Sequence, residues 1–170
     1  MVARKGSKSS PEAIGHLDRQ GHAHVVDVGD KQETKRRAVA EAIVVTTVEV
    51  ARAITEGRVP KGDVSAVVRI AGIAGAKRTS DLVPLCHPLA LTHVSADLAV
   101  TLEKNRGIAR IQVAAECIGR TGVEMEAMTG ASIAALTLYD MIKGLDRNAA
   151  IDRVVLLAKS GGRSGDWKRA

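Results

Sequence analysis

Aromatic residues are almost absent from this chain of 170 residues, which contains one Trp, one Tyr and no Phe. Modules that bind RNA on a β-sheet stack the bases on aromatic side chains of that sheet. This chain lacks such a platform, although its formal net charge of +6 favours acidic partners. Its core must therefore consist of Val, Ile, Leu and Ala, and small side chains of this kind favour further burial between subunits.

Cysteines and long apolar runs are also scarce. Cys86 and Cys117 form no CxxC pair, which argues against a zinc site built on them. No apolar run approaches the ~20 residues that span a bilayer, and the N-terminus lacks the apolar segment of a secretory signal. The sequence contains no GxxxxGK[ST], which excludes a P-loop. We expect a soluble, cytoplasmic protein without a metal or cofactor, which binds neither nucleic acid nor membrane.

The length predicts one domain. Residues 1–20 are rich in Gly, Ser, Lys and Arg, which predicts a disordered basic tail, and residues 21–170 then form a single catalytic domain. Hydrophobic periodicity and turn residues predict a strand over 36–47, helices over 47–57 and 63–79, a hairpin of strands 92–102 and 111–117, a helix over 123–145 and a strand over 153–160.

The order of these elements predicts the fold class. Strict alternation over 92–102 indicates a half-buried strand, Asp63 suits a helix cap, and Gly57 suits the end of a helix. Strand, helix pair, hairpin, helix and strand are the order of a ferredoxin-like split-βαβ fold. We therefore predict an α+β protein with an antiparallel sheet and helices packed on one face.

Two prolines enclose the first candidate site. Pro84 and Pro88 flank Leu85, Cys86 and His87, and each proline stiffens the backbone around it. A stiff loop suits a site that must hold groups in place, and His shuttles protons near neutral pH. The alternative is a tight structural connection that carries an incidental His.

The second candidate lies where a predicted strand meets the next helix. Glu124 and Glu126 flank Met125 there. Carboxylates in a first turn are stabilised by the helix dipole, which explains them structurally. The functional alternative is a substrate clamp or base formed by Glu126, with Met125 packing against a ring.

The third candidate is charged. Asp140 and Lys143 are three residues apart on one helix face, which gives either an ion pair or an acid/base unit. Five basic residues near element ends would suit a triphosphate if they converge, although each alone suits a solvated surface: Arg36, Lys61, Lys77, Lys143 and Lys159. SGGRSG suggests a C-terminal loop.

Three long segments together resemble a known family. KGDVSAVVRIAGIAGAKRTSDLVPLCHPL, GRTGVEMEAMTGASIAALTLYDMIK and LLAKSGGRSGD are similar, in this order, to the signature blocks of the molybdenum cofactor biosynthesis protein C family, the cyclic pyranopterin monophosphate synthases. The resemblance runs from about His22 to Lys168. It implies a ferredoxin-like homohexamer, a trimer of dimers, with the active site at a subunit interface.

The resemblance also implies a reaction and its residues. The family converts 3′,8-cyclo-7,8-dihydroguanosine 5′-triphosphate into cyclic pyranopterin monophosphate and pyrophosphate, which makes its members lyases. The implied catalytic residues are Asp140, Lys143 and Lys61. The implied substrate-binding residues are Leu85, Cys86, His87, Glu124, Met125, Glu126, Lys159 and Arg36.

Three other functions are compatible with parts of the sequence. An RNA-binding module fits the fold and charge but lacks the aromatic platform. A regulatory domain of the same fold would bind a small molecule and leave it unchanged. A Schiff-base enzyme would use Lys143 as its nucleophile.

Overall fold

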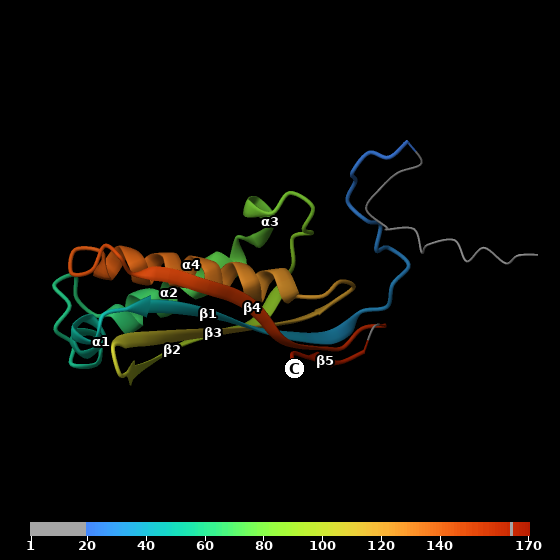
Figure 1. Ribbon diagram of the computed structural model, residues 1–170. Coiled ribbons are helices and arrows are strands. Elements are labelled where there is room, and N and C mark those ends of the chain that lie inside the picture. The colour runs from blue at the N-terminus through green and yellow to red at the C-terminus, as the bar shows by residue number, and fades with distance from the viewer. Residues whose placement is uncertain (1–19, 164) are drawn as a thin grey trace, which may run out of the picture.

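The computed structural model describes residues 20–163 and 165–170, so the predicted tail, apart from Gln20, lies outside the described residues. Figure 1 shows the elements along the chain. They are β1 (Thr34–Thr46), α1 (Val48–Thr55), α2 (Val64–Lys77), α3 (Thr79–Leu82), β2 (Leu91–Glu103), β3 (Arg106–Gly119), α4 (Glu124–Ile142), β4 (Ala150–Ser160) and β5 (Trp167–Lys168).

One antiparallel sheet has the strand order β2-β3-β1-β4-β5. The long helices α2 and α4 run side by side across one face of this sheet (Figure 1). Strands β1 to β4 have the order of a ferredoxin-like fold, and the predicted α+β class is confirmed.

Small residues allow the helices to approach the sheet closely. Successive inward residues of β1, among them Ala40 and Ala42, are fully buried, and Ala127 and Ala131 of α4 are equally buried opposite them. A Cβ on Gly130 would lie 2.8 Å from Cγ1 of Val113 on β3. The core therefore reaches its packing density through close backbone approach, without large aromatic side chains.

The predicted helix boundaries at Asp63 and Gly57 are confirmed. The Asp63 carboxylate accepts a hydrogen bond from the Ala66 backbone N–H at 2.9 Å and caps α2. Gly57 follows α1 with φ of +65°, a conformation that glycine adopts without strain. These two ends fix the loop that carries Lys61.

Two short elements were not predicted. Helix α3 forms a single turn between α2 and the proline-flanked loop, and β5 pairs with the end of β4. The SGGRSG segment connects β4 to β5. No helix in the described part of the chain is long and apolar enough to cross a membrane.

Candidate active site

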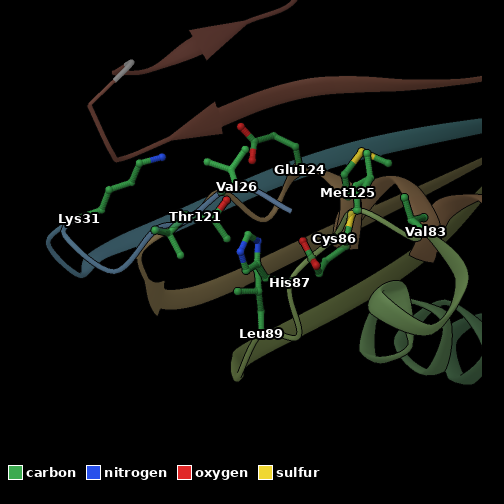
Figure 2. Close-up of a pocket in the computed structure, with 13 residues that line it drawn as sticks. Val26, Lys31, Val83, Cys86, His87, Leu89, Thr121, Glu124 and Met125 are labelled. Carbon is green, nitrogen blue, oxygen red and sulfur yellow. The ribbon is translucent and has the colours of Figure 1, made fainter. Parts of the chain in front are cut away.

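A cavity of about 460 Å³ lies at the N-terminal end of α4. The proline-flanked loop supplies Leu85, Cys86 and His87, the start of α4 supplies Glu124, Met125 and Glu126, and the segment before β1 supplies Val26, Val28 and Lys31. In Figure 2, Cys86, His87 and Leu89 face the same space as Val26 and Glu124. The structure thus brings six of the predicted substrate-binding residues to one cavity.

Local hydrogen bonds hold the loop that contributes Cys86 and His87. The Cys86 backbone N–H donates to the Val83 carbonyl oxygen at 3.0 Å, directly after the turn of α3. Burial, and then the nearby Glu126 carboxyl, raise the pKa of the Cys86 thiol above its ordinary value. Cys86 is therefore a protonated, weakly polar wall of the cavity at neutral pH and no thiolate nucleophile.

Glu126 is the most deeply buried charged residue of this cavity. Its side chain is 4% exposed, and Oε2 has no hydrogen-bond partner among the described residues. Burial raises the pKa of Glu126 from 4.5 to about 7, and the neighbouring Glu124 carboxylate raises it further, against a lowering by the backbone N–H. Its polar atom is available to a ligand in the cavity.

A second cavity, of about 650 Å³, adjoins the first and shares Lys31, Thr121, Gly122 and Glu124 with it. Basic residues dominate its charge, and they are Lys31, Arg36, Arg120, Lys159 and Arg163. Asp30 and Glu124 are its acidic residues. Lys159 Nζ lies 3.2 Å from Glu124 Oε1, so this ion pair stands at the junction of the two cavities.

Arg36 has a structural partner as well as a place in the second cavity. Its Nε donates to the Gly119 carbonyl oxygen at 2.8 Å and Nη2 donates to the Arg120 carbonyl oxygen at 3.1 Å. A Cβ on Gly162, whose φ is +79°, would collide with Nη1 of the same guanidinium. The glycines after β4 therefore allow the loop to close over Arg36.

A separate cluster lies at the C-terminal end of α4. Lys143 Nζ lies 2.8 Å from Asp140 Oδ1, and Lys61 Nζ lies 2.7 Å from Oδ2. Hydrogen bonds from Lys143 and then Lys61 lower the pKa of Asp140 to about 2, and Asp140 in turn raises the pKa of Lys143. All three side chains are about half exposed, so the cluster is open to solvent and to a ligand.

The two ends of α4 are far apart. Glu126 and Asp140 are 14 residues apart on one helix, which corresponds to roughly 21 Å at 1.5 Å per residue. One chain therefore carries the predicted site residues in two groups, and no single small molecule contacts both groups of the same chain.

The sequence analysis missed several residues that line these cavities. Arg120 directly precedes the VEMEA segment and Arg163 lies within SGGRSG, so both adjoin segments already singled out. Thr34 also lines the second cavity, and its buried Oγ1 has no hydrogen-bond partner among the described residues. Arg147 and Tyr139 line a cavity of about 390 Å³ beside Lys61 and Lys143. Lys77, at the end of α2, lines none of these cavities.

No group of three or more His, Cys, Asp and Glu side chains suited to a metal ion occurs within residues 20–163 and 165–170. The chemistry of both clusters therefore rests on proton transfer, hydrogen bonding and charge neutralisation by the side chains just described.

Comparison with known proteins identifies relatives over nearly the whole chain. The sequence model of the MoaC family matches residues 25–162. A protein of Chloroflexus aurantiacus named cyclic pyranopterin monophosphate synthase is 53% identical over 156 residues, which cover 92% of this chain and 94% of the relative. Proteins of the same name from Thermomicrobium roseum and Chloroflexus aggregans are 51% and 49% identical, over 92% and 94% of this chain and 93% and 96% of their own lengths.

Proposed function

The chain belongs to the MoaC family, and we propose that it is a cyclic pyranopterin monophosphate synthase, a lyase of molybdenum cofactor biosynthesis. It converts 3′,8-cyclo-7,8-dihydroguanosine 5′-triphosphate into cyclic pyranopterin monophosphate and pyrophosphate. The observation that carries this proposal is the pair of adjoining cavities, one largely apolar and one lined by five basic residues.

The two cavities match the two halves of this substrate. The guanine-derived ring occupies the first cavity, where Leu85 and Met125 offer apolar contacts and His87, Cys86 and Glu126 offer polar ones. The triphosphate occupies the second cavity, where several cations offset its charge. Glu124 holds Lys159 at the junction until the phosphates take its place.

The chemistry requires proton transfers as the ring opens and closes, and stabilisation of pyrophosphate as it leaves. Lys143 is a protonated donor at neutral pH, because Asp140 raises its pKa. Asp140 is ionised and is held between two ammonium groups. We assign proton transfer to the Asp140–Lys143 pair and electrostatic stabilisation to Lys61.

The distance along α4 supports a site shared between subunits. Because the two groups of residues lie at opposite ends of one helix, the N-terminal end of one copy and the C-terminal end of another together complete one active site. We propose that this occurs in a homohexamer arranged as a trimer of dimers. An alanine-rich core suits such an assembly, since further burial between subunits offsets its small side chains.

The cell compartment forms part of the proposal. Cys86 and Cys117, the two cysteines of the chain, are both unpaired thiols. Unpaired cysteines are typical of a reducing compartment, which supports a cytoplasmic location.

The direct test is conversion of the cyclised nucleotide by the purified protein under anaerobic conditions. We expect equal amounts of pyrophosphate and of a pterin, which is fluorescent after oxidation. Folded protein that binds the nucleotide and returns it unchanged would contradict the enzyme proposal and indicate a regulatory domain. Borohydride trapping of substrate on Lys143 would instead indicate Schiff-base chemistry.

A further inference from the structure

Glu126 differs from the other acidic residues around the two cavities because no cation pairs with it. Glu124 lies against Lys159, whereas Glu126 has an unpartnered Oε2 and a 4% exposed side chain. A buried ionised carboxylate without a partner costs several kcal/mol, so such a group remains protonated instead.

The groups around Glu126 reinforce this state. Its own helix contributes Glu124, whose charge disfavours a second carboxylate. The proline-flanked loop contributes the Cys86 thiol and His87, β3 contributes the Cys117 thiol, and the segment before β1 contributes Lys31 at the side shared with the second cavity. The pKa of Glu126 near 7 agrees with this arrangement, since burial is its largest cause.

We propose that Glu126 binds the substrate ring as a neutral carboxylic acid and thereby selects the lactam edge of that ring. Its O–H donates to the ring carbonyl oxygen, and its C=O accepts a hydrogen bond from the adjacent ring N–H. This inference rests on the proposed function, because it takes the ligand of the first cavity to be the pyrimidinone ring of the guanine-derived substrate.

The protonation state decides which ring edge is recognised. A neutral carboxyl offers one donor and one acceptor, which match the adjacent carbonyl and N–H of a lactam. An ionised carboxylate offers acceptors alone, which match the ring N–H and the exocyclic amino group. A ligand that lacks the amino group therefore distinguishes the two states.

The first experiment measures the proton on Glu126 in the free protein, independently of any turnover. The carboxyl carbons of 13C-labelled Glu are titrated by NMR, and Glu126→Gln identifies the signal of interest. We expect that signal to titrate near pH 7, well above the other glutamates. Titration of the signal near 4.5 would overturn the inference. Absence of turnover with the cyclised nucleotide would overturn the proposed function and leave this titration unchanged.

The second experiment measures the binding of GTP and ITP, which share the lactam and differ in the amino group. For a neutral Glu126, both bind with affinities within about threefold, and both weaken up to tenfold per pH unit above the pKa, as release of one proton requires. Glu126→Gln keeps one donor and one acceptor at every pH, so it flattens this profile. A preference for GTP above tenfold, or stronger loss of binding in Glu126→Gln at pH 6 than at pH 8.5, would overturn the inference.

Glu124→Gln provides a matched variant on the same helical turn. It removes the like charge that contributes to the raised pKa of Glu126. We expect the midpoint of the pH profile to move to lower pH without becoming flat. A flat profile in Glu124→Gln would assign the titration to Glu124 and overturn the inference for Glu126.

Discussion

The two ends of α4 treat a carboxyl group in opposite ways. At the N-terminal end, burial raises the pKa of Glu126 to about 7. At the C-terminal end, Lys143 and Lys61 lower the pKa of Asp140 to about 2. The helix dipole alone would produce the reverse, since it stabilises negative charge at the N-terminus and destabilises it at the C-terminus.

Magnitudes explain why the dipole loses at both ends. A helix terminus contributes ~0.3–1 kcal/mol to a nearby charge. The shift of Glu126 from 4.5 to about 7 corresponds to ~3 kcal/mol at about 1.4 kcal/mol per unit. Desolvation at one end and two directly bonded ammonium groups at the other are therefore the dominant causes. Each end thus holds the protonation state that its proposed role requires.

The largest expected effect follows from breaking the exposed end. Lys143→Ala or Asp140→Asn should lower kcat by about 10²- to 10⁴-fold, the usual contribution of general acid–base catalysis. Both side chains are about half exposed, so the melting temperature should change little. Turnover and thermal melting are measured together, with Lys104→Ala in the exposed β2–β3 turn as the control. Loss of folded protein in Lys143→Ala would indicate a structural role instead.

A mixing experiment tests whether the two ends act in one site. His87→Ala and Asp140→Asn are each expected to abolish turnover, since they damage opposite ends of α4. Co-expression of the two variants should restore about a quarter of wild-type activity per site, because one in four random pairings joins two intact ends across an interface. Co-purified mixed oligomers without activity would show that the two ends do not share a site.

The sequence was sufficient to predict most of the fold, because the long elements carry clear periodicity and caps. The alternation of β2, the Asp63 cap and Gly57 each has a local physical cause. The turn of α3 and the two residues of β5 are too short to show a period, and β5 depends on pairing with a distant strand. Tertiary contacts decide such elements.

The site residues were predictable as residue types and only partly as an arrangement. The i,i+3 spacing predicted the contact between Asp140 and Lys143. Lys61 reaches the same carboxylate from the α1–α2 loop, 79 positions away in sequence. No local pattern indicates that contact, nor the burial that leaves Glu126 without a partner.

Glu126→Gln sharpens the comparison through stability. The raised pKa means that the folded state keeps a proton that the unfolded state has lost between pH 4.5 and 7. Wild-type stability therefore falls as pH rises across this window, by up to ~3 kcal/mol. Glu126→Gln should remove that slope, so we expect it to be more stable than wild type at pH 8 by about 1–3 kcal/mol, relative to their difference at pH 4.5. Denaturation at the two pH values measures this, and a wild-type slope that survives in the variant would assign the proton elsewhere.

The smallest expected effect concerns Lys61 and the exposed carboxylate. Lys61→Met removes one of the two ammonium groups while Lys143 remains bound to Oδ1. Because the Lys143 hydrogen bond is the larger cause, the pKa of Asp140 should rise only part of the way from about 2 towards 3.8. Lys143→Met should raise it further, and NMR titration of the Asp140 carboxyl compares the two variants. A lowered folded-state pKa stabilises the fold above the unfolded value and loses that contribution as pH falls towards 2, so each variant should weaken the pH dependence of stability in acid. Equal pKa values in both variants would show that the lysines are interchangeable, and the assignment of proton transfer to Lys143 rather than Lys61 would then lose its electrostatic basis.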